Sequence, residues 1–183
     1  MSIVAGIDYS MTSPALCIHD GDTWDFRNCK FFYMVKKDKH LVVTDQLKGS
    51  IYPDYSCDPE RYDNLSRWAL SIIKEYSVEK VFIESYSFGS VGRIFQIAEN
   101  TGALKYQLWK QGLEYDVYPP TVIKKFGCGK GNADKAKMWE AFKEETQYNI
   151  FNILGQEEAK NWNPVSDIVD AYFIAKLGFS NKK

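Results

Sequence analysis

The sequence predicts an α/β protein in which helices cover the faces of a mixed β-sheet. Three strand-like segments follow one another at the start of the chain, and later strand-like segments alternate with helical ones. Consecutive strands pair antiparallel and strands joined through a helix pair parallel, so the two patterns together imply a mixed sheet. The 183 residues suffice for one full hydrophobic core, and we expect a single domain over residues 1–183.

The first predicted strand is the apolar run at residues 3–7, which ends at a single acid, Asp8. Such a run is typical of a strand buried on both faces. A turn rich in Ser, Thr and Pro separates it from a second strand at residues 15–18, and residues 28–35 predict a third. Residues 36–57 mix charges with glycine and proline, and we expect a long excursion there.

The first predicted helix begins at Asp58, a capping acid, with Pro59 at its first helical position. Apolar residues then recur at the i, i+3, i+4 and i+7 spacing of an amphipathic helix as far as residue 76. Residues 80–84 predict another buried strand, which ends in a second acid, Glu84.

The remaining elements continue the alternation. Residues 90–111 predict a helix, and residues 115–118 predict a short fifth strand before two prolines. We expect a helical turn and a glycine-bearing loop at residues 121–132. Two helices follow, one capped by Asn132 and ending near residue 147, the other capped by Ser166 and ending at residue 177.

Composition and charge exclude several classes of protein. The chain has no apolar run long enough to span a bilayer and no signal peptide, so we expect a cytoplasmic protein with no membrane partner. The net charge of -1 means that any nucleic-acid binding must come from a local patch. The four cysteines are far apart and form no C-x-x-C pair, so we expect neither a disulfide framework nor structural zinc.

Four acids stand out by their positions. Asp8 and Glu84 end apolar strands, where active sites of α/β sheets gather, and Asp167 and Asp170 share a face in the first turn of the last helix. Acids in a first turn also serve merely to oppose the helix dipole, and strand-end acids are common. Yet the last helix is apolar almost all round, and buried carboxylates need cations. Together the four suit Mg²⁺ or Mn²⁺, and two such ions would activate water against a phosphodiester.

A basic segment follows the fifth strand. Its lysines supply counter-charge to phosphate, and its interleaved glycines let the backbone approach closely, so it is a candidate clamp on DNA. The alternative is an ordinary solvated loop and helix surface. The lysines are Lys124, Lys125, Lys130, Lys135 and Lys137.

The loop after the second acidic strand end carries two aromatic residues, Tyr86 and Phe88. Exposed aromatic rings beside a metal site stack on unpaired bases, although either ring could instead fold back into the core. Arg93 is a candidate phosphate contact. His19 and His40 lack any ligand spacing, and we assign them no role.

The ordered set of motifs resembles the RuvC family of Holliday junction resolvases, within the ribonuclease H-like superfamily. The matching segments occur in the family's order over nearly the whole chain, and the compact size resembles bacteriophage members. They are G-I-D at residues 6–8, F-I-E at 82–84, P-P-T-V-I-K-K at 119–125, G-K-G-N-A-D-K-A-K at 129–137 and D-I-V-D-A at 167–171. The turn after the first strand departs from the family, with Tyr9-Ser10 and Ser13-Pro14 where Pro-Gly and Thr-Gly are usual.

The resemblance implies a ribonuclease H-like fold with a mixed five-stranded sheet and the activity of a crossover junction endodeoxyribonuclease. It implies two Mg²⁺ ions, replaceable by Mn²⁺, on a catalytic tetrad, and no nucleotide cofactor. It also implies a homodimer through the helix at residues 90–111 that nicks two opposing strands of a four-way junction, and activity on other branched DNA. The resemblance and the residue patterns together predict these site residues: Asp8, Glu84, Asp167 and Asp170 for metal and catalysis, Lys124 and Lys135 for catalysis, and Phe88, Tyr86, Arg93 and all five lysines for DNA.

Three alternatives stay open. A nuclease of the same fold that acts on RNA, of the pre-16S ribosomal RNA processing type, would share the acids. An actin-like or sugar-kinase-like phosphotransferase also begins with a strand ending in Asp, but we find no adenosine motif and no second half to hold a nucleotide. A non-catalytic junction-binding module would not need four acids near the core, because they would repel phosphate without metal.

Overall fold

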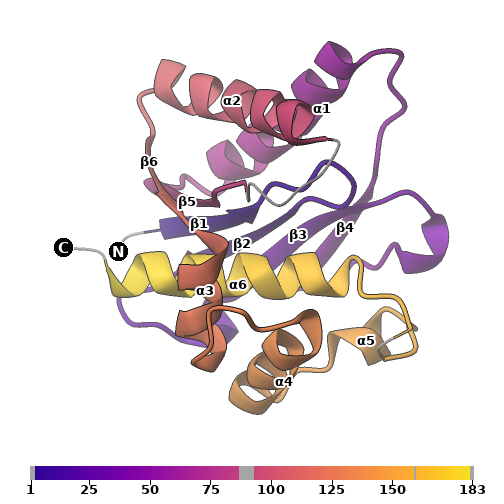
Figure 1. Cartoon of the computed structure of the whole chain (residues 1–183), viewed down its shortest axis with the longest axis vertical. Helices are drawn as coiled ribbons and strands as arrows, with labels where there is room; N and C mark the ends of the chain where they lie inside the picture. Colours follow the sequence, from indigo (N-terminus) through magenta and orange to yellow (C-terminus); the bar gives the residue numbers. More distant parts are fainter. Residues whose placement is uncertain (1–2, 87–92, 159, 182–183) are drawn as a thin grey trace.

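Six strands form one mixed sheet in the order β4-β3-β2-β1-β5-β6 (Figure 1). The structure, a computed structural model, describes residues 3–86, 93–158 and 160–181. Strand β2 runs antiparallel to both of its neighbours, and the other paired strands are parallel. The strands are β1 (Ile3–Asp8), β2 (Ala15–Asp20), β3 (Cys29–Val35), β4 (Leu47–Ile51), β5 (Lys80–Glu84) and β6 (Glu114–Tyr118).

The predicted mixed α/β sheet is confirmed, but the expected five strands are six. The additional strand, β4, lies inside the segment that sequence analysis treated as an excursion, and it pairs parallel to β3 at the edge of the sheet. Its sequence, LKGSI, lacks alternation of apolar and polar residues. An edge strand needs only one neighbour, and here Gly49 leaves room for the ring of Tyr33, so pairing rather than periodicity defines the strand.

Helices cover both faces of the sheet in two layers (Figure 1). Helices α1 and α2 lie on one face, over a core that includes Ile7, Leu65 and Leu104. Helices α3, α4, α5 and α6 lie on the opposite face, where α6 runs along the sheet over a core that includes Phe82 and Tyr172. The helices are η1 (Phe26–Asn28), η2 (Asp38–His40), α1 (Asp58–Glu75), α2 (Ile94–Lys110), α3 (Pro120–Cys128), α4 (Lys135–Thr146), α5 (Ile150–Ile153) and α6 (Val165–Ser180).

Several predicted helix ends are wrong by one to three residues. Asp134 rather than Asn132 caps α4, because its side chain accepts a hydrogen bond from the backbone N–H of Lys137. The residue before α6 is Pro164, and Ser166 lies inside the first turn, where its hydroxyl takes part in tertiary contacts instead of capping. Helix α6 also continues past the predicted end to Ser180.

The remaining helix boundaries differ in smaller ways. Asp58 is the first residue of α1 rather than its cap. The helical turn expected near residue 121 is the longer helix α3. Helix α2 begins at Ile94 among the described residues, and its predicted start at Ser90 lies outside them.

Close packing of α6 against the sheet fixes the position of the α6 N-terminus. Gly6 of β1 lies against the α6 backbone, and a Cβ on Gly6 would overlap main-chain atoms of Ala171 and Ala175. Gly178 of α6 similarly leaves room for the ring of Phe82 on β5. Because neither position has room for a methyl group, α6 packs directly on β1 and β5, and its first turn lies over the ends of these strands.

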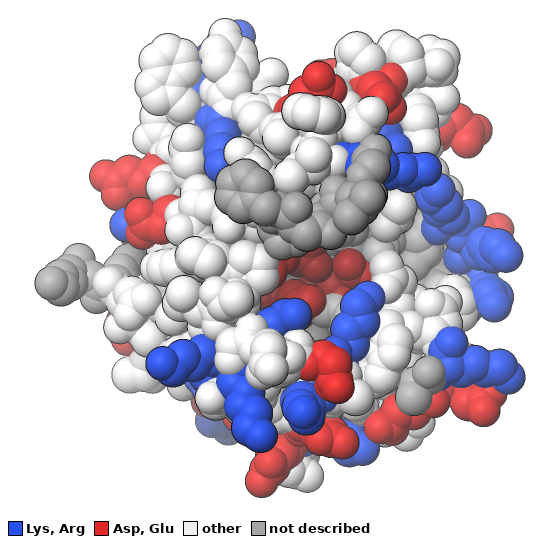
Figure 2. Space-filling model, viewed as in Figure 1, with Lys and Arg blue, Asp and Glu red and all other residues white. Residues whose placement is uncertain are grey.

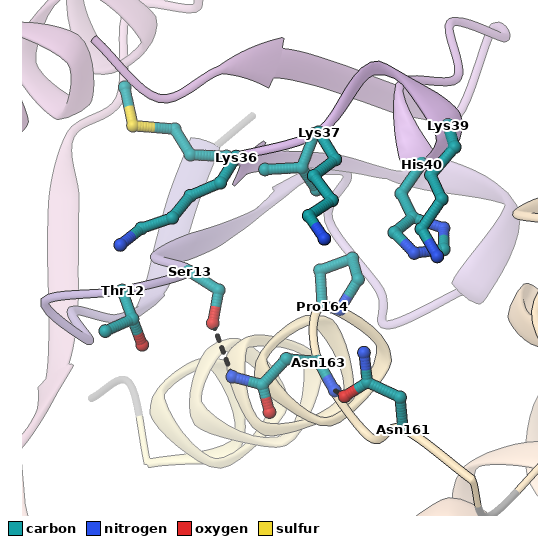
Figure 3. A pocket seen from close by; sticks show the side chains of 11 residues that line it. Thr12, Ser13, Lys36, Lys37, Lys39, His40, Asn161, Asn163 and Pro164 are labelled. Carbon is teal, nitrogen blue, oxygen red and sulfur yellow. Dashed lines mark hydrogen bonds between the residues drawn. The ribbon is translucent and has the colours of Figure 1, made fainter. Parts of the chain in front are cut away.

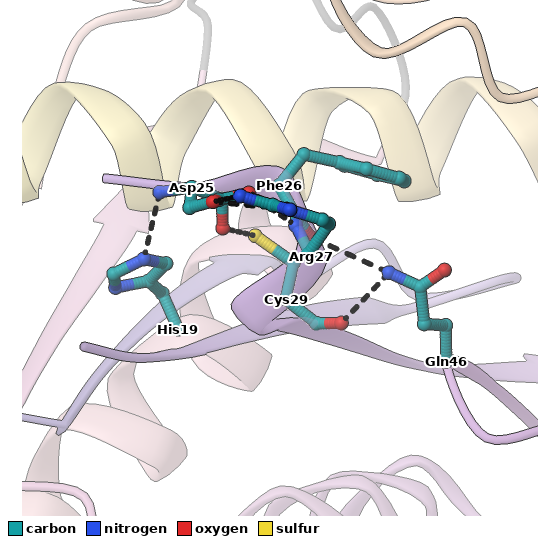
Figure 4. Close-up of polar contacts among 6 residues, drawn as sticks. All are labelled: His19, Asp25, Phe26, Arg27, Cys29 and Gln46. Carbon is teal, nitrogen blue, oxygen red and sulfur yellow. Dashed lines mark hydrogen bonds and ion pairs between the residues drawn. The ribbon is translucent and has the colours of Figure 1, made fainter. Parts of the chain in front are cut away.

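The connection between β2 and β3 is held by polar contacts that Figure 4 draws. Asp25 caps η1 and pairs with Arg27, its backbone N–H donates to Nε2 of His19 at 3.3 Å, and Gln46 donates to the carbonyl of Phe26 at 3.3 Å. His19 is buried and stacks on Trp24, so its role is structural. No helix in the described ranges is long and apolar enough to cross a membrane.

Candidate active site

Two of the predicted acids lie side by side at the ends of neighbouring parallel strands. Ile7 of β1 pairs with Ile83 of β5, so the next residues, Asp8 and Glu84, end the two strands together. Side chains alternate along a strand, and Asp8 therefore points to the same face as Gly6, against which α6 packs. The register of β1 and β5 thus directs both carboxylates toward α6.

The other two acids come from the first turn of α6, which lies over these strand ends. Asp167 is buried and accepts a hydrogen bond from Oγ of Ser13 at 2.8 Å. Asp8 lies beside Asp167, whose negative charge adds to the effect of burial in raising the pKa of Asp8. Asp170 lies three residues further along the helix and lines the same cleft as Asp8 and Glu84.

The four carboxyl groups have raised pKa values because they are buried and repel one another. Burial, followed by the charges of Glu84 and Asp167, raises the pKa of Asp170 to about 8. Burial raises the pKa of Glu84 to about 7 and that of Asp167 to about 6. Burial and the other three acids raise the pKa of Asp8 well above its ordinary value. The fold therefore concentrates more negative charge here than the described residues neutralise.

Two lysines oppose this charge. Lys124 of α3 lowers the pKa of Glu84 and of Asp170, and Lys135 of α4 lowers the pKa of Asp167 and of Asp170. Nζ of Lys135 is held by Oδ1 of Asn163 and Oγ of Ser166, each at 3.1 Å. Both lysines border a small hollow of about 70 Å³ that also contains Asp170, so the structure brings these predicted catalytic residues together.

A polar network that the sequence patterns do not predict holds Asp167. Nδ2 of Asn163 donates to Oγ of Ser13 at 2.6 Å, and that hydroxyl donates to Asp167, so Lys135 and Asp167 are linked through two side chains, those of Asn163 and Ser13. Ser13 is 150 residues from Asn163 and 154 from Asp167. No local pattern could have revealed contacts at such separations.

An open cleft of about 610 Å³ lies over the acids. Figure 2 shows acidic side chains at the bottom of a hollow in the middle of the molecule's face, with basic side chains directly below it. Ile97 and Thr101 of α2 line one side of the cleft, and α3 lines another. The predicted DNA contacts Tyr86 and Arg93 also line it.

The remaining predicted DNA contacts are placed differently. Lys125 is exposed and lines neither the cleft nor the small hollow. Lys130 and Lys137 line a separate hollow of about 500 Å³, where Glu140, Glu144 and Glu145 also lie. Phe88, the predicted stacking residue, lies outside the described residues.

The donor chemistry of the four acids suits a hard divalent cation. No lysine or arginine in the described ranges lies within ion-pair distance of any of the four, so their excess charge favours a cation over a salt bridge. Among those same residues, however, no three His, Cys, Asp or Glu side chains are close enough together to hold a metal ion as they stand.

Comparison with known proteins gives one sequence relative and several structural ones. No protein-family model matches the chain. The crossover junction endodeoxyribonuclease RuvC of Corynebacterium diphtheriae is 32% identical over 117 residues. The match spans 63% of this chain and 65% of that protein, slightly less than two thirds of its length.

Three solved structures are similar over nearly the whole chain. The structure of Thermus thermophilus RuvC has a TM-score of 0.59 and 20% sequence identity, over 97% of both chains. The structure of T. thermophilus RuvC in complex with a Holliday junction substrate has a TM-score of 0.60 and 18% identity, over 98% of both chains. The yeast mitochondrial Holliday junction resolvase Ydc2 has a TM-score of 0.61 and 12% sequence identity, over 97% of this chain and 78% of that one. Similarity at these identities establishes the fold.

Proposed function

We propose that this chain, which has the fold of the RuvC-like Holliday junction resolvases, is a single-domain, metal-dependent endodeoxyribonuclease. It would resolve four-way DNA junctions in the cytoplasm by paired nicking. The observation that carries the proposal is the convergence of four carboxyl groups from β1, β5 and α6 under an open cleft, with Lys124 and Lys135 beside them. The name of the Corynebacterium relative supports the same chemistry.

Asp8, Glu84, Asp167 and Asp170 would hold the divalent cations, Mg²⁺ or in its place Mn²⁺, which supply water activation and stabilise the leaving oxygen. The chain's own residues prepare the site. Ser13 donates to Asp167, lowers the pKa of its carboxyl group and so keeps it ionised and fixed in orientation.

The two lysines have complementary parts in this proposal. Lys124 lowers the pKa of Glu84 and Asp170 and so favours their ionised forms against the effect of burial, and it lines the cleft where a phosphate would lie. Lys135 is fixed by Asn163 and Ser166, so its ammonium group is pre-oriented. Preorganised positive charge of this kind stabilises the negative charge that develops on a phosphodiester under attack.

DNA would enter from the open side of the cleft. Tyr86 and Arg93 line the cleft, where an aromatic ring and a guanidinium group would contact bases and phosphates respectively. Phe88, in the same loop, stays our candidate for stacking at the junction centre. Lys125, Lys130 and Lys137 stay predicted contacts, although Lys130 and Lys137 would meet DNA outside the cleft.

We infer a homodimer through α2. The side chains of Phe95, Tyr106 and Trp109 are 79%, 57% and 70% exposed, and they recur at the spacing of one helix face. Exposed aromatic residues grouped in this way mark interaction surfaces. Paired nicks require two active sites, and each chain supplies a single set of these acids, so a second copy of the chain is the partner that the activity demands.

The function is tested with end-labelled synthetic DNAs, each with Mg²⁺ present or withheld. The set comprises a four-way junction, a Y-fork, a plain duplex and an RNA stem. We expect symmetric paired nicks across the four-way junction only with metal, and no cutting by the Asp170→Asn variant, which should still bind the junction.

Each other outcome changes the assignment in a defined way. Equal cutting of the Y-fork would extend the substrate to branched DNA in general. Cutting of the RNA stem alone would overturn the DNA assignment in favour of an RNA-processing nuclease. Tight junction binding without any cutting would reduce the protein to a binding module.

A further inference from the structure

We propose that a second, basic hollow beside the cleft binds backbone phosphates of a DNA arm that leaves the active site. The inference rests on the proposed function, since it extends the path of the same DNA. The hollow has a volume of about 330 Å³ (Figure 3). Its polar lining residues are Thr12, Ser13, Lys36, Lys37, Lys39, His40, Asn161 and Asn163.

The positive charge comes from one short segment after β3. Lys36 and Lys37 directly follow the strand, and Lys39 and His40 belong to η2. Figure 3 shows these side chains on one side of the hollow and Ser13, Asn161 and Asn163 on the other. A phosphate group between the two sides would meet ammonium groups from one wall and amide or hydroxyl groups from the other.

The segment also contains one acid, Asp38, so its three lysines leave an excess of positive charge. In the part of the chain that the structure describes, none of the three lysines forms an ion pair with an acid. Burial and then the positive charges of Lys39 and Lys37 lower the pKa of His40. Lysines without acidic partners around a concave polar surface attract a polyanion, although Nζ of Lys36 also lies 5.7 Å from the centroid of the Tyr52 ring.

The hollow adjoins the catalytic cleft. Thr12 lines both, and Ser13 and Asn163 line the hollow while their side chains form the network that holds Asp167. A strand whose scissile phosphate lies over the acids therefore has its continuation next to the three lysines. Thr12 therefore lies at the border between the two sites.

The lining also indicates which part of a nucleic acid is bound. Of the side chains that line the hollow, only His40 is aromatic, so the site has no ring platform for an unstacked base. Lysine contacts to phosphate position a duplex without reading its sequence. We therefore assign the site to the backbone of a base-paired arm, bound independently of sequence.

The test measures the salt dependence of DNA binding by the full chain with divalent metal withheld. The variant carries Lys36→Gln, Lys37→Gln and Lys39→Gln. The control carries Lys30→Gln, Lys48→Gln and Lys74→Gln, which change the charge by the same amount. Lys30 lies near the start of β3, Lys48 near the start of β4 and Lys74 at the end of α1, and Lys30 and Lys48 lie near Tyr76. The probes are a fluorescent four-way junction and a plain duplex.

Loss of three phosphate contacts reduces the slope of log affinity against log salt by about 2.7. Between 50 and 200 mM salt, wild type should thus lose about 40-fold more affinity than the variant, and the control should follow wild type. A wild-type slope in the variant, or an equal loss in the control, would overturn the inference.

Cleavage of the junction by wild type, assayed in parallel with Mg²⁺, separates this inference from the proposed function. If wild type cuts the junction while the variant keeps the wild-type slope, the hollow fails and the function stands. If wild type cuts nothing while the variant loses slope on either probe, the hollow stands and the function fails.

Discussion

At the scale of single residues, the raised carboxyl pKa values turn into a dependence of stability on pH. A carboxyl group whose pKa is higher in the folded than in the unfolded chain binds more protons when folded, so the free energy of unfolding falls as pH rises between the two values. For Asp170 that window runs from its ordinary value of 3.8 up to about 8, and for Glu84 from 4.5 up to about 7.

We therefore predict that Asp170→Asn stabilises the metal-free protein at pH 8 and does so less at pH 5. The amide removes a buried charge that wild type carries only at the higher pH. For a chain of this length, 1 kcal/mol corresponds to a Tm change of about 2–4 °C, and we expect an increase of at least about 3 °C at pH 8. Thermal unfolding by circular dichroism in the presence of a chelator measures it.

The control for this prediction is Asp25→Asn. Hydrogen bonds from Arg27 lower the pKa of Asp25 to about 2, so neutralising it should not raise Tm at pH 8. A lower Tm for Asp170→Asn than for wild type at pH 8 would contradict the view that this carboxylate is repelled in the metal-free fold.

Ser13 is predicted to position Asp167 rather than to react. Removing a hydrogen bond that orients a metal ligand typically lowers metal affinity about 10- to 100-fold. Ser13→Ala should therefore raise the Mg²⁺ concentration needed for half-maximal cleavage by about 10-fold, and reduce the Tm increase that Mg²⁺ produces. Ser13→Thr keeps the hydroxyl and should restore both; failure of this rescue would assign Ser13 a merely structural role.

At the scale of elements, the contact of β1 with α6 determines where the α6 acids lie. Gly6→Ala forces a methyl group into the α6 backbone, and we predict a loss of about 2 kcal/mol or more in the free energy of unfolding. Gly102→Ala is the matched control, because a Cβ there meets nothing within 4 Å and alanine favours a helix interior by about 0.5–1 kcal/mol. Urea unfolding measures both, and equal stabilities would show that α6 can shift without cost.

The elements also show how far sequence reasoning reaches. The strands ending in Asp8 and Glu84 were predicted because apolar runs are local signals, and the parallel pairing of β1 with β5 then brought the acids together. Strand β4 was not predicted, because only its pairing with β3 defines it as a strand. The Ser13–Asn163 contact escaped because it joins residues 150 positions apart, which no spacing rule covers.

Helix α4 offers a direct comparison of two lysines. Lys135 donates to Asn163 and Ser166 and lines the small hollow that contains Asp170. Lys143 instead pairs with Glu158 at 3.5 Å on the protein surface. Lys135→Ala should reduce the single-turnover cleavage rate at least about 10-fold, since it removes preorganised positive charge from the reaction centre. Lys143→Ala should leave that rate unchanged, and equal rates in both variants would remove Lys135 from the mechanism.

At the scale of the whole molecule, one chain supplies one set of four acids, so two coordinated nicks require two chains. Helix α2 is suited to join them, because Ile97 and Thr101 line the cleft while Phe95 and Trp109 are largely exposed. A dimer through this helix would couple the two clefts mechanically. Loss of this dimer should leave DNA binding and single nicks intact but abolish the coupling of the two nicks, without changing any catalytic residue.

We predict that Trp109→Glu yields a monomer that still nicks a cruciform-bearing plasmid but no longer converts it to linear DNA. On a supercoiled plasmid that extrudes a cruciform, the first nick releases the supercoiling and the junction is reabsorbed, so only a coupled second cut produces linear DNA. Wild type should give linear product and Trp109→Glu mainly nicked circles, with sedimentation velocity reporting the oligomeric state. Val43→Glu, at a residue 71% exposed on the segment before β4, is the control and should behave as wild type. Linear product from a monomeric Trp109→Glu protein would show that the two nicks need no dimer through α2.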